Sequence, residues 1–252
     1  MSKSFIAFGD AHVPNDNSAA LEGLKRTIEF IKPNVTVSLG DMLDCSQFSA
    51  HPPTWGEEDT DFSDDLGKVN NLLDFIQKHT KDRTVCVEGN HEARIARWAA
   101  KNKEGRAIYN MVCPRIRMSR GRKKFTYIPY TTVDGRYPHY KLNGRIVAVH
   151  GWSYAKHATA MHLTLSQGKS IIHGHTHRAQ AEHRQSLWGK AECVGMSAGC
   201  LCRPIPTYGT GSPVSWVNGF ILGYMGRNSD RMYFVAIDPD NGDVILPSGK
   251  KI

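Results

Sequence analysis

The sequence predicts an α/β fold, in which the strands of a parallel sheet alternate with helices. Over the first ninety residues, short apolar runs alternate with stretches in which apolar residues recur every three or four positions, the pattern of strand–helix–strand units. Each apolar run ends in glycine followed by polar residues, as expected where a strand enters a loop. With 252 residues, of which 40% are hydrophobic, the chain can bury a core, which excludes disorder of the whole chain.

Three strands and two helices are expected in this first part of the chain. The strands are expected at residues 4–9, 35–39 and 84–88. The first helix is expected at residues 18–31, and a loop rich in proline and acidic residues at 51–65. The second helix has Ser63 as its expected N-cap. Its apolar residues follow helical spacing from Leu66 to Ile76.

The second half is predicted to be richer in β-structure. A hairpin is expected where strands at 140–142 and 145–149 flank Asn143-Gly144, a dipeptide that favours tight β-turns. The other expected elements are a helix at 155–165, a strand at 170–172, hairpin turns at 188–190 and 240–243, and a glycine- and proline-rich loop at 203–219. No linker is recognisable, so we expect a single domain over residues 1–252.

Positive charge is concentrated in the later part of the chain. The net charge of the whole chain is +8. Residues 1–100 contain 10 basic and 16 acidic side chains, whereas residues 101–252 contain 22 basic and 8 acidic ones. The densest stretch runs from Arg94 to Lys124, and we expect a basic helical and loop insertion at about residues 94–130. Such a run can neutralise phosphates and attract DNA or RNA. The alternative is a solvated surface that has no partner.

Cysteine content and hydropathy indicate a reducing, aqueous compartment. Six cysteines are too few for a disulfide scaffold, and none forms a Cys-x-x-Cys pair, so a thiolate zinc site is not expected. No apolar run approaches the roughly 18 residues of a membrane helix. The N-terminal apolar stretch ends at Asp10, too soon for a signal peptide. We therefore predict buried, reduced thiols in a soluble cytoplasmic protein.

Polar side chains suited to metal binding follow five of the expected strands. Along the chain they are Asp10 and His12, Asp41 and Asp44, Asn90 and His91, His150, and His175 and His177. Since the carboxyl ends of strands in an α/β sheet line one crevice, we expect these residues to meet there. Carboxylate and imidazole ligands suit divalent Mn, Fe, Zn or Ni. A lone histidine at a strand end is usually structural, but five such loops together favour a metal centre.

The same five loops resemble those of the calcineurin-like metallophosphoesterase superfamily. The matching blocks, in the family's order, are Gly9-Asp10-Ala11-His12, Gly40-Asp41-Met42-Leu43-Asp44, Gly89-Asn90-His91-Glu92, His150-Gly151 and Gly174-His175-Thr176-His177. The resemblance implies a four-layer αββα sandwich. In addition, the segment from Trp216 to Phe220 is similar to bacteriophage-encoded members of the superfamily.

The resemblance also implies a role for each ligand. Asp41 would bridge two divalent ions, Mn²⁺ in the first place, with Fe, Zn or Ni as alternatives. The other ligands would be Asp10, His12 and His177 for one ion, and Asn90, His150 and His175 for the second. A hydroxide held between the ions would attack the phosphorus, and His91 would protonate or stabilise the leaving oxygen. Asp44 would contact the metal ligands without binding an ion itself, or would simply cap the following helix.

One departure from the family's protein phosphatases bears on the substrate. These enzymes carry arginine directly after the Gly-Asp-x-x-Asp block, where this chain has Cys45. Arg94 and Arg97 could act as a phosphate clamp instead, or could belong to the basic surface. We expect a phosphodiesterase or nuclease that hydrolyses nucleic-acid or nucleotide diesters. The alternatives are a phosphatase for phosphomonoesters or phosphoproteins, a cyclic-nucleotide phosphodiesterase, and a metal-binding scaffold without turnover; the oligomeric state is not predicted.

Overall fold

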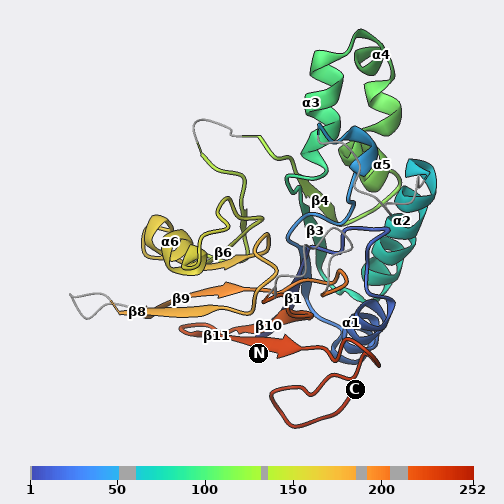
Figure 1. The fold of residues 1–252 in the computed structure, drawn as a ribbon. Helices are drawn as coiled ribbons and strands as arrows, with labels where there is room; N and C mark the ends of the chain where they lie inside the picture. Colours follow the sequence, from blue (N-terminus) through green and yellow to red (C-terminus); the bar gives the residue numbers. More distant parts are fainter. Residues whose placement is uncertain (1, 51–60, 132–135, 186–191, 205–214) are drawn as a thin grey trace.

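Two β-sheets, packed face to face, form the centre of the molecule (Figure 1). The structure is a computed structural model that describes residues 2–50, 61–131, 136–185, 192–204 and 215–252. The predicted loops at 51–65 and 203–219 lie mostly outside these residues, and the predicted turn at 188–190 lies wholly outside them. Among the helices of the described ranges, none combines the length and the apolar composition that crossing a membrane requires.

The larger sheet has six strands in the order β11-β10-β1-β2-β3-β4. In chain order they are β1 (Lys3–Phe8), β2 (Val35–Ser38), β3 (Arg83–Val87), β4 (Phe125–Ile128), β10 (Gly219–Met225) and β11 (Asp230–Ala236). The first four are parallel, whereas β10 pairs antiparallel with β1 and β11 pairs antiparallel with β10. The basic stretch at 94–130 therefore contributes a strand, β4, to this sheet as well as helices.

The smaller sheet has five strands in the order β5-β6-β7-β9-β8. In chain order they are β5 (Tyr140–Lys141), β6 (Ile146–Val149), β7 (Ser170–His173), β8 (Ala181–Gln185) and β9 (Glu192–Ser197). The predicted hairpin joins β5 to β6, and the side chain of Asn143 accepts hydrogen bonds from the N–H groups of Arg145 and Ile146 in its turn. The sequence prediction of this hairpin is confirmed.

Helices α1 (Ser18–Ile31) and α2 (Phe62–His79) pack on the outer face of the larger sheet. Helix α1 has the predicted bounds, and the side chain of Asn17 accepts hydrogen bonds from two N–H groups of its first turn. The N-cap of α2 is Asp61, whose carboxylate accepts a hydrogen bond from the N–H of Ser63. The prediction of Ser63 as the cap was therefore wrong. A carboxylate both caps the first turn and complements the positive end of the helix dipole.

The remaining helices lie beyond the larger sheet, beside α2 and β4, or on the smaller sheet (Figure 1). Between β3 and β4 the chain forms α3 (Ala93–Lys101), α4 (Lys103–Val112) and α5 (Pro114–Ser119), with the short 3₁₀ helix η1 (Ser46–Phe48) beside α3. Helices α3 and α4 extend beyond the end of the larger sheet, whereas α5 packs against α2 and β4. Helix α6 (Ala158–Leu165) covers the outer face of the smaller sheet and begins three residues later than predicted.

Alternate residues of the strands face different layers, which shows how the sandwich is built. In β1, Phe5 and Ala7 belong to the core between the two sheets, whereas Ile6 and Phe8 belong to the core beneath α1 and α2. In β6, Ile146 and Ala148 face the larger sheet, whereas Val147 and Val149 face α6. Strand side chains alternate with period two, so the central strands of each sheet bury both faces. The result is the expected four-layer arrangement, helix–sheet–sheet–helix.

Strands β10 and β11 were not predicted from the sequence. Strand β10 is almost wholly buried, and β11 alternates in exposure along its length. The turn between them, at residues 226–229, is closed by a hydrogen bond from the N–H of Gly226 to the carbonyl of Ser229. It lacks the Asn-Gly or Asp-Gly dipeptide that revealed the hairpin at 140–149, so only the apolar run at 220–222 was available as a signal.

Candidate metal centre

Loops at the C-terminal ends of parallel strands bring the predicted ligands together. These residues follow β1 (Asp10, His12), β2 (Asp41, Asp44), β3 (Asn90, His91), β6 (His150) and β7 (His175, His177). Both aspartates nearest the strands, Asp10 and Asp41, are buried, as are the four histidines predicted as ligands. The residues predicted to meet at the strand ends therefore lie in neighbouring loops at one edge of the sheets.

Asp10, His12 and His177 form the first group of donor atoms. The Nε2 atoms of the two histidines lie 3.1 Å apart. Oδ1 of Asp10 lies 3.3 Å from Nε2 of His177 and 4.0 Å from Nε2 of His12. Two imidazole nitrogens and a carboxylate oxygen thus converge on one point, as ligands of a divalent transition ion do.

Asp41, His150 and His175 form the second group. Oδ2 of Asp41 lies 3.3 Å from Nε2 of His150, and Nδ1 of His175 lies 3.1 Å from the same nitrogen. The amide oxygen of Asn90 lies 2.8 Å from it as well. The second group therefore brings together the residues that the family resemblance implies for the second ion.

The carboxylate of Asp41 lies between the two groups. Its Oδ2 atom faces Nε2 of His150 on one side and, at 3.8 Å, Nε2 of His12 on the other. Its Oδ1 atom accepts a hydrogen bond of 2.9 Å from the backbone N–H of His91. One carboxylate oxygen is therefore shared between the two sets of donors, which is the position that a bridging ligand requires.

The loops that present these residues have an unusual backbone. Left-handed φ angles between 50° and 69° occur at Asp10, His12, Asp41, His175 and His177. Residues other than glycine rarely adopt this region, and such strain is concentrated at functional sites. Glycine is required beside them: a Cβ atom on Gly174 would lie 2.5 Å from Oδ2 of Asp10, and one on Gly89 would overlap the carboxylate of Asp41. The glycines of two sequence blocks thus permit close packing around the aspartates.

Hydrogen bonds fix the orientation of the imidazole rings. Nδ1 of His150 donates to the carbonyl of Leu39 at 2.8 Å, which leaves Nε2 free to act as a ligand. Nδ1 of His12 lies 3.1 Å from Oδ1 of Asp44, so its Nε2 is likewise directed to the centre. Metal-bound histidines in proteins are held in this way by a carbonyl or carboxylate on the second nitrogen.

The electrostatics of the site favour ionised carboxylates beside a cation. Burial alone would raise the pKa of Asp41, but the imidazoles of His150, His91 and His12 hold it well below its ordinary value. Burial would lower the pKa of His150, but the charge of Asp41 raises it to about 9. Burial and the neighbouring His150 lower the pKa of His175 to about 4. Buried carboxylates that stay ionised suit a divalent cation, so the donor set fits the expected metal ions.

His91 lies at the edge of this centre, close to Asp41. Its Nε2 atom is 4.0 Å from Oδ2 of Asp41. Its Nδ1 atom is 2.9 Å from Oδ1 of Asp44, so Asp44 contacts two histidines of the site, His12 and His91. The side chain of Asp44 therefore supports the imidazoles. It is not the cap of the helix that follows, because the N-cap position of η1 is Cys45.

The two arginines predicted as a clamp occupy different positions. Arg94 lies beside the centre, with Nη2 3.1 Å from Nε2 of His91 and Nη1 donating to the carbonyl of Asp44 at 3.0 Å. Arg97 donates to the carbonyl of Asn90 at 2.5 Å and to that of Ala93. Arg94 is thus close enough to meet a ligand at His91, whereas Arg97 stabilises the backbone of the Asn90 loop.

Glu92 is a buried carboxylate whose role the sequence did not reveal. It accepts hydrogen bonds from the backbone N–H groups of Asp41, Met42, Leu43 and Gly89 at 2.6–3.0 Å. It therefore ties the loop after β2 to the loop after β3. Burial and the charge of Asp41 raise its pKa to about 7. The only sequence signal is its place directly after Gly89-Asn90-His91.

Comparison with known proteins concerns the family and the fold of the chain. The sequence model of the family described as calcineurin-like phosphoesterase matches residues 3–190, whereas no curated protein matches the chain. A solved structure of Vps29 from Chaetomium thermophilum is similar with a TM-score of 0.52 at 12% identity, covering 99% of this chain and 97% of that one. Vacuolar protein sorting 29 from Cryptosporidium parvum gives 0.50 at 13% identity, covering 100% and 95%.

A third solved structure, the phosphoesterase YfcE from E. coli, gives a TM-score of 0.45 at 14% identity, covering 99% of this chain and 98% of that one. At these identities the structural likeness concerns the fold alone. The family match, in contrast, spans most of the sequence and all five ligand loops. The chain therefore belongs to the calcineurin-like phosphoesterase family.

Proposed function

We propose that this protein is a dinuclear metal-dependent phosphoesterase that hydrolyses nucleic-acid or nucleotide phosphodiesters. The observation that carries the proposal is the position of Asp41, whose Oδ2 atom faces both His150 and His12. A carboxylate shared by two donor sets is what a pair of metal ions about 3.5–4 Å apart requires. We further propose that it works in the cytoplasm, where its six cysteines stay reduced.

The chain's own residues would divide the work as follows. One ion would be held by Asp10, His12 and His177, the other by Asn90, His150 and His175, with Asp41 contributing to both. When bound, the ions would supply Lewis acidity toward the phosphoryl group and a nucleophile at neutral pH. Asp44 and the carbonyl of Leu39 would keep the ligand nitrogens of His12 and His150 aimed at them.

His91 is the proposed proton donor to the leaving oxygen. Asp44 holds its Nδ1 atom, so Nε2 is presented beside Asp41 on the side where Arg94 also lies. A histidine placed within hydrogen-bond reach of the leaving group can act as a general acid near neutral pH. The guanidinium of Arg94 would help to bind the phosphate, because position 45, where the protein phosphatases of the family carry arginine, is a cysteine in this chain.

The preference for a polyanionic diester rests on the helices next to the centre. Arg117 and Arg120 are exposed, at and just after the end of α5. Arg122 is different: its guanidinium binds Asn70 and Asp74 of α2, so it belongs to the fold. The exposed arginines could neutralise phosphates of a nucleic-acid strand while the phosphodiester bond to be cleaved lies beside Asp41.

The first experiment compares a diester with a monoester. Purified protein reloaded with Mn²⁺ is assayed with bis-p-nitrophenyl phosphate and with p-nitrophenyl phosphate, and His91→Ala is the test variant. We expect diester turnover, reduced by about 10²–10⁴-fold in the variant, as for loss of a general acid. His157→Ala, an exposed histidine on the smaller-sheet side, is the matched control and should keep full activity.

The other outcomes decide among the alternatives. Faster turnover of the monoester would favour a phosphatase, and the basic helices would then be surface only. Bound metal without turnover of either ester would contradict the enzyme and favour a scaffold. In that case Asp41→Asn should leave partner binding intact.

A further inference from the structure

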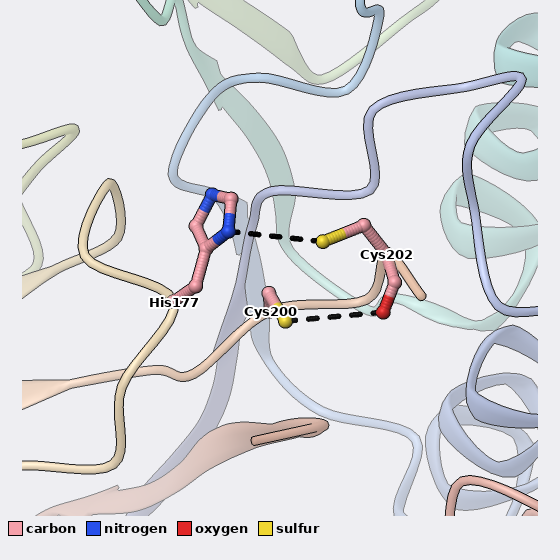
Figure 2. A group of neighbouring side chains, drawn as sticks. All are labelled: His177, Cys200 and Cys202. Atoms are coloured by element: carbon pink, nitrogen blue, oxygen red, sulfur yellow. Dashed lines mark hydrogen bonds between the residues drawn. The ribbon is translucent and has the colours of Figure 1, made fainter. Parts of the chain in front are cut away.

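Two cysteine thiols lie against His177, on the side of its ring that faces away from the metal centre. Sγ of Cys202 is 3.8 Å from Nδ1 of His177, whereas Nε2 of the same ring faces Asp10. Figure 2 shows the three side chains converging from two loops, one after β7 and one after β9. Sγ of Cys200, Sγ of Cys202 and Nδ1 or Nε2 of His177 all lie within 4.8 Å of one another.

The backbone around the two cysteines is held rigidly. The N–H of Cys202 donates to the carbonyl of Asp10 at 3.0 Å. The side-chain amide of Asn218 donates to the carbonyls of Cys200 and Cys202 at 3.2 and 2.8 Å. Both thiols are buried, with exposed fractions of 0% for Cys200 and 3% for Cys202. The sulfurs are thus preorganised beside the histidine before any ligand arrives.

This arrangement has the dimensions of a thiolate metal site. Tetrahedral zinc with sulfur at about 2.3 Å and nitrogen at about 2.0 Å places sulfur and nitrogen roughly 3.5 Å apart. The observed separation of 3.8 Å between Cys202 and His177 is close to that value. Two thiolates and one imidazole form a three-ligand zinc set with an open fourth position. The missing Cys-x-x-Cys spacing had argued against such a site, but here the third ligand comes from a distant loop.

We propose that Cys200, Cys202 and Nδ1 of His177 form a separate binding site for one thiophilic divalent cation, with Zn²⁺ as the candidate ion. Binding would form two metal–sulfur bonds and one metal–nitrogen bond. The two thiols would each release a proton to solvent. The hard ligands around Asp41 are carboxylate, amide and imidazole, so the two sites differ in the softness of their donors.

His177 makes the two sites depend on each other. A neutral imidazole has one nitrogen with a proton and one that can bind metal. If Nδ1 binds the thiophilic ion, Nε2 carries the proton and donates to Oδ1 of Asp10, 3.3 Å away. If Nε2 instead binds an ion of the Asp10 group, Nδ1 donates to Cys202. Only the second arrangement supports the proposed phosphoesterase, so this coupling, unlike the thiol site itself, rests on that proposed function.

The thiol site is tested with Cd²⁺ as a spectroscopic probe. Reduced protein is titrated with Cd²⁺ while the ultraviolet thiolate-to-cadmium charge-transfer band is recorded. We expect a band that saturates at one equivalent, that is lost in Cys200→Ser/Cys202→Ser, and that persists in Cys193→Ser, a cysteine of β9 outside the cluster. No band in the wild-type protein, or a band that survives the double substitution, would overturn the proposal.

A second measurement needs no variant. The wild-type protein is alkylated with iodoacetamide in mild denaturant, with and without Zn²⁺, and modified cysteines are located by mass spectrometry. We expect Zn²⁺ to slow the modification of Cys200 and Cys202 selectively. Equal slowing of all six cysteines would mean that Zn²⁺ stabilises only the fold, and would contradict the site.

The coupling has its own readout. Mn²⁺ binding, followed by electron paramagnetic resonance, should weaken by about 10–100-fold when Cd²⁺ occupies the thiol site, as for loss of ligand support. The double cysteine variant should not show this response. Because neither readout uses turnover, a protein without phosphoesterase activity could still pass the test of the thiol site.

Discussion

At the scale of single residues, the centre depends on side chains that hold its loops as much as on the ligands. Glu92 accepts four backbone N–H groups from the loops that carry Asp41 and Asn90. Asp44 holds two imidazoles at once. Neither needs to contact a metal ion. Their geometry fixes where the ligand atoms lie, and ligand position determines affinity.

Glu92→Gln tests this supporting role. The substitution puts an NH₂ group where one oxygen now accepts hydrogen bonds, so buried N–H groups lose their partners, at about 1–3 kcal/mol each. We expect the free energy of unfolding, measured in urea, to fall by about 2 kcal/mol or more. Mn²⁺ affinity, measured by calorimetry, should fall about 10–100-fold.

Glu104→Gln is the matched control, because Glu104 is exposed in the first turn of α4. It should change neither quantity appreciably. If Glu92→Gln behaves like this control, the carboxylate does not hold the two loops together.

At the scale of elements, α6 is attached to the smaller sheet through a buried polar contact. Nδ1 of His162 donates to the carbonyl of Ala158 at 2.5 Å, and its Nε2 accepts from the N–H of Trp152 at 3.1 Å. The ring stacks on His173 of β7, with 4.4 Å between centroids. Because both nitrogens are already used in the neutral form, a second proton has no acceptor.

This contact predicts a pH dependence of stability. Burial, and the nearby charge of His150, lower the pKa of His162 below its ordinary value of 6.5. The unfolded chain therefore takes up a proton at this residue first, and the free energy of unfolding should fall as the pH drops below about 6.5. One group can contribute at most about 1.4 kcal/mol per pH unit.

The measurement compares urea unfolding at about pH 7.5 and about pH 5.5, roughly one unit on either side of the ordinary histidine pKa. His162→Gln can donate and accept the same hydrogen bonds without titrating, so its stability should change less between the two values than that of the wild type. His157→Gln, an exposed residue at the start of α6, should keep the wild-type difference. Equal differences in all three proteins would exclude His162 as a source of the effect.

At the scale of the whole molecule, the basic helices begin at the end of the larger sheet that carries the metal centre. Helices α3–α5 follow β3, whose C-terminal end carries Asn90 and His91. Arg117 and Arg120 are exposed there and line a shallow hollow between α2 and α5. A long polyanion could therefore contact these helices while one of its phosphates lies at the centre.

Charge reversal separates this surface from the chemistry. Arg117→Glu/Arg120→Glu should weaken binding of single-stranded DNA and lower the slope of log affinity against log salt, by about 0.7 for each phosphate that the protein no longer neutralises. Turnover of bis-p-nitrophenyl phosphate should not change, because this small diester does not reach α5. Fluorescence anisotropy over a range of salt concentrations measures the slope.

Arg227→Glu/Arg231→Glu alters the net charge equally on the β10–β11 hairpin. If both double variants lose the same affinity, net charge and not the helical surface attracts the nucleic acid. If neither loses any, the proposed polyanionic substrate is wrong while the phosphoesterase itself can still be correct.

Whether a feature could be predicted from the sequence depends on how far apart along the chain the residues that form it lie. Helix α1 and strands β1–β3 have local signals, and the glycine-flanked ligand loops identify the centre. Strand β10 gains its place by pairing Phe5 with Gly223, more than two hundred residues apart, and no local pattern reports that. The roles of Glu92 and of Cys200 and Cys202 arise only where separate loops meet. The N-cap at Asp61 was missed because Asp61 and Ser63 are both suitable cap residues and lie only two positions apart.

The pairing of β1 with β10 also determines when the centre can form during synthesis. Asp10 and His12 leave the ribosome early, but β1 remains an open sheet edge until residues 219–225 have emerged. The carbonyl of Asp10 also awaits the N–H groups of Leu201 and Cys202. Unpaired edges invite association with other chains. The growing chain therefore has its first two ligands long before it has the strand that pairs with β1, and this sheet edge stays open to other chains over that interval.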